Sequence, residues 1–144
     1  MQLDDIFELW SKDSEIDTAR IDKESIKIPQ LHNKYYKIFS QERLLLKKYE
    51  TDYKKLYLLK FEYFLGTLDE ETLKENNWVP NPKMTLKGDI PLHIEADQDV
   101  INLTLKIGYQ KEKTSVLESI IKNITDRGYM IKNYIEWQKF TNGA

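Results

Sequence analysis

The feature that most constrains this fold is a helical repeat of apolar residues across residues 30–65. The apolar side chains recur at steps of three, four or seven residues, the spacing that lines up one face of an α-helix. They are Leu31, Tyr35, Ile38, Leu45, Tyr49, Tyr53, Leu56 and Tyr63. Most of the cations in this stretch fall opposite that stripe on an ideal helix. The pattern therefore predicts one long helix that buries one side and exposes a basic, aromatic-rich face.

The cations of this stretch indicate a phosphate-binding surface. They are Lys34, Lys37, Arg43, Lys47, Lys48, Lys54, Lys55 and Lys60. Tyr57 lies among the last of them, and cations interleaved with aromatic rings hold single-stranded nucleic acid without sequence preference. The alternative is a helical scaffold or adaptor whose basic face is only solvated. Lys60 differs from the others because the helical projection places it inside the apolar stripe, where a lysine must reach solvent or meet an anion.

Size and composition limit the class of protein. With 144 residues, 40% hydrophobic and 32% charged, the chain fits one small domain whose helices need partners to cover their apolar stripes. No apolar run approaches the roughly 20 residues that cross a bilayer, and the first residues lack the basic start of a signal peptide. The absence of cysteine excludes a disulfide framework and a thiolate metal site. Residues 1–25 form an acidic arm that would shield the basic helix or bind a different partner.

The segments before the long helix suggest a short helix followed by a break. One face of a short amphipathic helix is formed by Leu3, Ile6, Phe7 and Trp10. This helix is expected to end within residues 11–14. Pro29 is expected to break the chain before the long helix, because proline lacks a backbone donor and clashes with the preceding turn. The long helix is expected to end at Gly66.

The middle of the chain is expected to be irregular. Residues 67–82 indicate a loop with one turn of helix near residues 69–74. A small β-hairpin is predicted near residues 84–94, because apolar residues alternate there around Lys87, Gly88 and Asp89. The alternating residues are Met84, Leu86, Ile90, Leu92 and Ile94.

The last third has the clearest helical period and predicts a pair of helices. Uncharged and mostly apolar residues step by three and four, at Val100, Leu103, Ile107, Gln110, Thr114, Leu117, Ile121 and Ile124. Asp97 is placed as the N-cap of the first helix. Gly128 is placed as its left-handed C-cap, so that a second helix runs from Tyr129 to about Phe140.

Self-association is expected through this C-terminal pair. A chain this small has little else to cover both apolar faces, and neighbouring copies can bury one another. The residues expected to join subunits are Leu117, Ile121, Ile124, Met130, Ile131, Tyr134, Ile135 and Trp137. The alternative is an intramolecular hairpin of the two helices with an ordinary core. The chain is thus divided into a nucleic-acid-binding region, residues 1–96, and an oligomerisation region, residues 97–144.

The sequence offers little for catalysis. It has no glycine-rich phosphate loop, no nucleophile elbow and no metal-ligand spacing. Its two histidines, His32 and His93, fall on different elements and are expected to be surface or packing residues. We therefore expect no catalytic residue, no metal and no cofactor, and the protein is predicted not to be an enzyme.

Several short segments along the chain form a recognisable series. These segments are residues 1–6, 12–13 and 16–18, Phe61–Phe64 before Gly66, Ala96–Val100, Arg127–Tyr129 and Ile131–Lys132. No single segment is a specific motif, but their order and spacing together are distinctive. In this series the chain resembles the UvsY recombination mediator proteins of T4-like phages over nearly its whole length.

The resemblance implies a mainly helical, non-enzymatic helper of homologous recombination. Members of this family form a ring, here a hexamer or heptamer, through C-terminal helices. They bind single-stranded DNA, contact a RecA-like phage recombinase and the phage single-strand binding protein, and help the first replace the second. The resemblance thus places the protein in the cytoplasm of the infected bacterial host, away from any membrane.

The resemblance also points to individual DNA-binding positions. Of two basic residues that the family places near the end of the long helix, the later matches Lys60 and the earlier falls on Leu58. Spacing suggests that Lys54 and Lys55, one turn back, compensate for Leu58. The predicted DNA-binding set is Lys47, Lys48, Lys54, Lys55, Tyr57 and Lys60.

Overall fold

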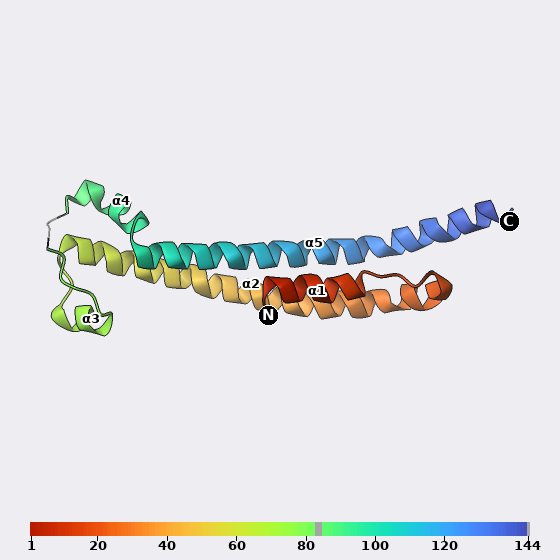
Figure 1. Cartoon of the computed structure of the whole chain (residues 1–144), viewed down its shortest axis with the longest axis horizontal. Helices are drawn as coiled ribbons and strands as arrows, with labels where there is room; N and C mark the ends of the chain where they lie inside the picture. The colour runs from red at the N-terminus through yellow and green to blue at the C-terminus, as the bar shows by residue number, and fades with distance from the viewer. Residues whose placement is uncertain (83–84, 144) are drawn as a thin grey trace. The chain divides into compact units, whose positions relative to one another are not determined.

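The structure is a computed structural model that describes residues 1–82 and 85–143 (Figure 1). Its α-helices are α1 (Leu3–Asp13), α2 (Ile21–Leu65), α3 (Glu70–Glu75), α4 (Ile90–Glu95) and α5 (Gln98–Thr141). Two short 3-10 helices, η1 (Thr18–Arg20) and η2 (Lys87–Asp89), precede α2 and α4. The described residues contain no strand, so the prediction of a mainly α-helical protein is confirmed.

The chain forms two compact units. Unit 1 comprises residues 1–44 and 111–144, and unit 2 comprises residues 45–110, so α2 and α5 contribute to both. This structural division differs from the functional division between residues 96 and 97, which stays a prediction.

Unit 1 is built around a core to which α1, α2 and α5 all contribute. Ile6, Tyr35, Leu117, Ile120 and Ile124 form this core and are almost completely buried. Figure 1 shows α1 lying along the first half of α2. Each fully buried aliphatic side chain contributes roughly 1.5–3 kcal/mol to the free energy of unfolding. Burial of Ile6 in this core therefore stabilises the short helix that was predicted at the N-terminus.

Unit 2 has a smaller core beneath α4. Ile90, Ile94 and Val100 are buried, and side chains of α2 pack against them. These are Tyr53, Leu56, Tyr57, Phe61 and Phe64. Most of these side chains are aromatic, so this part of α2 packs against the core of unit 2 mainly through aromatic rings.

The predicted break at Pro29 is wrong, because α2 begins at Ile21 and runs through the proline. Proline in a helix interior removes one backbone hydrogen bond and costs roughly 3 kcal/mol. Ile28 and Leu31 lie on either side of it and both pack against the core of unit 1. Burial of these neighbours offsets the local penalty and keeps the helix continuous.

The predicted helix end at Gly128 is also wrong, and with it the C-terminal pair of helices. The single helix α5 continues to Thr141, so the alternative of a hairpin between two C-terminal helices is excluded as well. A glycine inside a helix costs only about 1 kcal/mol. Arg127 and Ile131 are buried before and after it, and their contacts hold the helix through this position.

The predicted β-hairpin near residues 84–94 is wrong from Leu86 onward, where η2 and α4 replace it. Ile90 and Ile94 are fully buried one helical turn apart, whereas Leu92 between them is exposed. The buried residues therefore recur every four positions, and an apolar alternation this short does not distinguish a period of four from a period of two. Met84 lies outside the described residues.

Two predicted helix boundaries are confirmed. Gly66 ends α2 with a positive φ of 78°, a conformation that glycine adopts without strain. Asp97 caps α5, and its Oδ2 accepts hydrogen bonds from the backbone N–H of Asp99 at 3.0 Å and of Val100 at 3.3 Å. Such a cap satisfies donors that the first turn of the helix leaves free.

Candidate functional site

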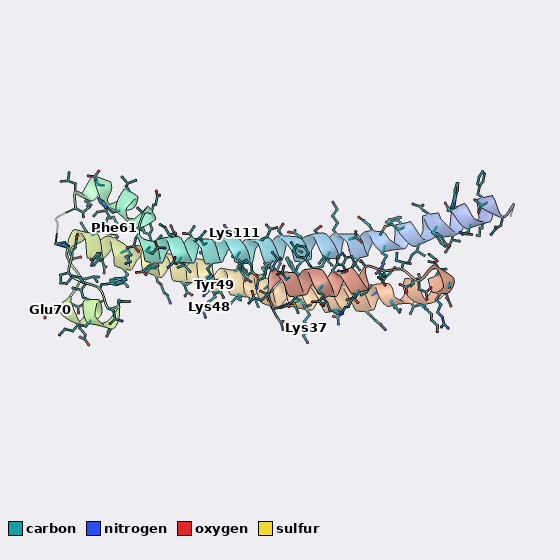
Figure 2. All side chains as sticks on the ribbon, in the orientation of Figure 1. Lys37, Lys48, Tyr49, Phe61, Glu70 and Lys111 are labelled. Atoms are coloured by element: carbon teal, nitrogen blue, oxygen red, sulfur yellow. The ribbon has the colours of Figure 1, made fainter. Side chains whose placement is uncertain are left out.

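Four of the predicted DNA-binding lysines form one exposed group on α2, here called the lysine set. It consists of Lys47, Lys48, Lys54 and Lys55, all exposed in unit 2. Within the described residues, no carboxylate lies within 4.0 Å of any of these ammonium groups. The set extends over roughly 12 Å of helix at 1.5 Å per residue. In Figure 2, Lys48 lies along the edge of α2. The lysine set therefore offers an anion exposed ammonium groups that are not held in a direct ion pair.

The aromatic residues beside the lysine set are largely occupied by the core. Tyr57 is half-buried, packs against the core of unit 2 and lies 6.1 Å from the ring of Tyr53. Phe61 is also half-buried and packs against the same core, and it is labelled near the α4 end of α2 in Figure 2. A base has only part of the Tyr57 ring available for stacking.

Lys60 occupies a different environment from the lysine set. Its side chain is only 4% exposed, and its Nζ lies 3.1 Å from Oδ1 of Asp97 and 2.9 Å from Oδ2 of Asp99. The expectation that a lysine in the apolar stripe must reach solvent or meet an anion is therefore satisfied by two carboxylates of the chain itself. Asp97 thus binds Lys60 with one oxygen and caps α5 with the other.

An aromatic side chain closes the Lys60 site from the loop after α3. Trp78 places its ring centroid 3.8 Å from the Lys60 Nζ, a distance typical of a cation–π contact. The loop is fixed there because the Tyr63 hydroxyl donates a hydrogen bond of 2.6 Å to the carbonyl oxygen of Val79. The sequence gives no periodic relation between Lys60 and its partners, so this arrangement was not predictable from spacing.

Leu58 faces solvent at the position where the resemblance loses a basic residue. Its side chain is 60% exposed, on the same helix as the lysine set. A cation at this position would meet solvent, and leucine leaves a small apolar area there.

The predicted oligomerisation residues divide into two groups. Leu117, Ile124 and Ile131 are buried within unit 1, and Ile121 and Tyr134 are half-buried. The other three, Met130, Ile135 and Trp137, remain at the surface.

The exposed members belong to a larger apolar surface at the end of α5. It consists of Tyr129, Met130, Ile135, Trp137 and Phe140 and is here called the terminal apolar surface. The rings of Trp137 and Phe140 stack at 5.9 Å. Figure 1 shows the last turns of α5 extending past the connection between α1 and α2. Exposed apolar side chains gathered at one end of a helix are typical of a contact site.

Neither histidine belongs to a cluster of metal ligands. The His32 ring stacks on Tyr36 at 5.7 Å, and the His93 ring lies 5.6 Å from Phe64. The described part of the chain contains no group of three or more histidine, cysteine or acidic residues that could hold a metal ion. Within that part, every helix is too short or too polar to span a membrane.

Comparison with known proteins identifies the family. Residues 9–144 match the family described as "Recombination, repair and ssDNA binding protein UvsY". No curated protein sequence matches the chain. The fold is similar to a crystal structure of the bacteriophage T4 recombination mediator protein UvsY in lattice type IV, with 20% identity, 97% of this chain and 99% of that chain covered, and a TM-score of 0.85.

A second crystal structure of the same T4 protein, in lattice type II, gives the same result. It also has 20% identity and a TM-score of 0.85, over 99% of this chain and 98% of that one. At this identity the structural likeness shows the fold alone, whereas the family match covers nearly the whole chain. The resemblance found in the sequence is confirmed, and this chain belongs to the UvsY family of recombination, repair and single-stranded DNA-binding proteins.

Proposed function

We propose that this protein is a recombination mediator that binds single-stranded DNA and promotes loading of a RecA-like recombinase in place of single-strand binding protein. The lysine set is the observation that carries the proposal. Its four ammonium groups are exposed and have no carboxylate within 4.0 Å among the described residues, so phosphates need not displace an internal partner. Phosphate contacts of this kind supply most sequence-independent affinity.

Lys60 has a supporting role in this proposal. Its ammonium group is held between Asp97 and Asp99, so it fixes the start of α5 beside the basic part of α2. Lys54 and Lys55 then supply the direct phosphate contacts that the resemblance assigns to Lys60 and to the position of Leu58.

The proposed assembly is a ring of identical subunits joined by the terminal apolar surface. A single lysine set binds weakly, but several sets that engage one strand act at high effective concentration. Each contact still exchanges locally, which would let the recombinase displace single-strand binding protein one segment at a time. The site of action in this proposal is the cytoplasm of the infected bacterial host, without a nucleotide or metal cofactor.

Titration with fluorescent oligo(dT) at several salt concentrations tests the DNA site. Replacing all four lysines of the lysine set by glutamine is expected to weaken binding and to reduce the salt slope by roughly 0.7 for each lost phosphate contact. A matched variant replaces Lys23, Lys74, Lys122 and Lys139, which are also exposed, and carries the same change of charge. Equal losses in both variants would contradict a localised site, and no saturable binding by the parent would favour the scaffold alternative.

The proposed ring is tested by placing charges on the terminal apolar surface. Trp137→Glu combined with Phe140→Glu changes exposed side chains and leaves the buried Ile131 in place, so folding is expected to be retained. Sedimentation should show smaller assemblies, and DNA affinity should fall although the lysine set is intact. A variant that stays fully assembled, or that dissociates and binds DNA unchanged, would exclude the proposed link between assembly and binding.

A further inference from the structure

A second aromatic and basic surface lies on α2 within unit 1, separate from the lysine set. His32, Tyr36, Phe39 and Arg43 follow one another at steps of four, three and four residues and form what we call the ring ladder. The His32 and Tyr36 rings stack at 5.7 Å with an interplanar angle of 11°. Tyr36 and Phe39 follow at 6.2 Å, and the Arg43 guanidinium lies 5.1 Å over the Phe39 ring.

Packing of unit 1 does not require the outer members of this ladder. His32, Tyr36 and Arg43 are exposed, and of the ladder residues only Phe39 packs against the core. The neighbouring Tyr35, in contrast, is fully buried. Pairs of side chains one turn apart contribute little to helix stability by themselves. The stacked His32 and Tyr36 rings therefore present aromatic surface to solvent without a structural need.

The charge around the ring ladder is positive. Lys37 and Arg43 are exposed, and within the described residues neither has a carboxylate within 4.0 Å. Glu42, the acid beside Arg43, is held by Lys113 at 3.0 Å. Figure 2 labels Lys37 on the side of α2 away from α5. A ligand at this surface would meet free cations beside stacked rings.

We propose that the ring ladder is a base-stacking subsite for single-stranded nucleic acid. Bases stack on the exposed faces of His32 and Tyr36, and Arg43 and Lys37 contact the adjoining phosphates. Aromatic rings beside cations are the usual platform for sequence-tolerant binding of single strands, and each stacked base adds substantially to affinity. This inference rests on the proposed function and extends it, because the lysine set supplies phosphate contacts whereas the ladder supplies base contacts.

The subsite is tested with two strands of equal length and charge, oligo(dT) and the same backbone without bases. Tyr36→Leu removes the ring, and Tyr36→Phe keeps it. Phe7→Leu is the matched control, since Phe7 is an exposed ring of unit 1 outside the ladder. Binding of each variant to each strand is measured at one salt concentration, and the salt slope is measured for the parent and Tyr36→Leu. Thermal unfolding by circular dichroism verifies that each variant is folded.

The expected result is specific for bases. Tyr36→Leu should bind oligo(dT) about 10-fold more weakly and the abasic strand as tightly as the parent, with the salt slope unchanged. Tyr36→Phe and Phe7→Leu should bind both strands like the parent. Equal loss on both strands, or no loss on oligo(dT), would overturn the subsite.

The failure of this inference is distinguishable from failure of the proposed function. If the parent binds oligo(dT) and the lysine variants lose affinity while Tyr36→Leu does not, the ring ladder alone is excluded. If the parent does not bind single-stranded DNA, both the mediator proposal and the subsite are excluded.

Discussion

Units 1 and 2 each fasten one helix end with a buried cation, but the two cations meet different partners. In unit 1, Arg127 is 1% exposed and donates hydrogen bonds to the carbonyl oxygens of Asp13, Ser14 and Glu15 at 2.8–3.1 Å. These carbonyls belong to the last residue of α1 and to the two residues after it, where the helix dipole favours a cation. In unit 2, Lys60 meets two carboxylates at the start of α5.

This difference determines whether the loss of each buried cation can be compensated by a second substitution. Three backbone carbonyls cannot be changed by substitution, so no second variant can compensate for loss of Arg127. The carboxylates beside Lys60 can be neutralised together with it, and replacing all members of a buried ion cluster is often tolerated. Substitutions of the two cations should therefore differ in the unfolding free energy that they remove and in whether a second substitution restores it.

The largest expected effect is that of Arg127→Ala. The substitution leaves three carbonyl oxygens without their donor and a cavity where the largest fully buried side chain lay, so we expect a loss of about 4 kcal/mol in unfolding free energy. Urea unfolding followed by circular dichroism measures it. Arg20→Ala, at an exposed arginine, is the control and should change stability by less than about 0.5 kcal/mol. Similar losses of unfolding free energy in the two variants would show that the hydrogen bonds of Arg127 do not stabilise unit 1 in the way proposed.

Lys60→Met is expected to cost about 2 kcal/mol, because Asp97 and Asp99 are left as neighbouring carboxylates without their cation, although solvent screens the half-exposed Asp99. Adding Asp97→Asn and Asp99→Asn should restore much of that loss, since asparagine also caps helices well. The same unfolding experiment measures both variants. A triple variant that is less stable than Lys60→Met would show that the rescue expected of unit 2 does not exist.

Asp13 extends the comparison to pH, because it joins α1 to α2 by its side chain. It accepts hydrogen bonds from Lys34 at 2.6 Å and from Tyr35 at 2.8 Å. Burial alone would raise its pKa, but these hydrogen bonds and the charges of Lys34 and Arg127 hold the pKa below its ordinary value of 3.8. The stabilisation is therefore present above that value and is lost as the pH falls through the lowered pKa of the folded state.

Asp13→Asn should accordingly reduce the unfolding free energy by about 1–2 kcal/mol at pH 7, and the difference from the parent should shrink below about pH 4. Urea unfolding at pH 7, 5 and 3 measures this change. Asp22→Asn is the control at an exposed carboxylate. A difference that stays constant with pH would show that shape rather than charge gives Asp13 its effect.

The smallest effect on stability, below about 0.5 kcal/mol, is expected for Leu58→Lys, because this side chain faces solvent. The substitution restores a cation where the resemblance expects one, beside the lysine set. Oligo(dT) titration should show tighter binding and a salt slope steeper by roughly 0.7. Leu92→Lys, another exposed leucine of unit 2, is the control. Equal gains in both variants would indicate a response to net charge rather than to position.

The parts of the fold that follow from local chemistry could be predicted from the sequence. Gly66 ends α2 because of its backbone freedom, and Asp97 caps α5 because its side chain reaches the first turn. The surface position of the lysine set follows from helical period alone. In each case the deciding contact lies within a few residues.

The parts that were missed depend on contacts between distant residues. Pro29 and Gly128 are strong local breakers, yet both lie inside helices because buried neighbours on either side favour continuation. The sequence indicated that Lys60 needs an anion, but its partners are 37 and 39 residues away. The ring ladder residues are spaced by four, three and four positions, which is also the spacing of a buried apolar stripe. Only the exposure of these side chains in the structure distinguishes the two.

The hydrogen bonds of Arg127 also bear on the order in which the molecule folds. They join residues 112 to 114 positions apart, so the loop that they close is among the longest that this chain permits. Loop closure of this length is entropically unfavourable, and contacts of high sequence separation form slowly. We therefore expect the Arg127 hydrogen bonds to form late, after α1 has docked on α2 through Asp13, whose contacts with Lys34 and Tyr35 span only 21 and 22 positions.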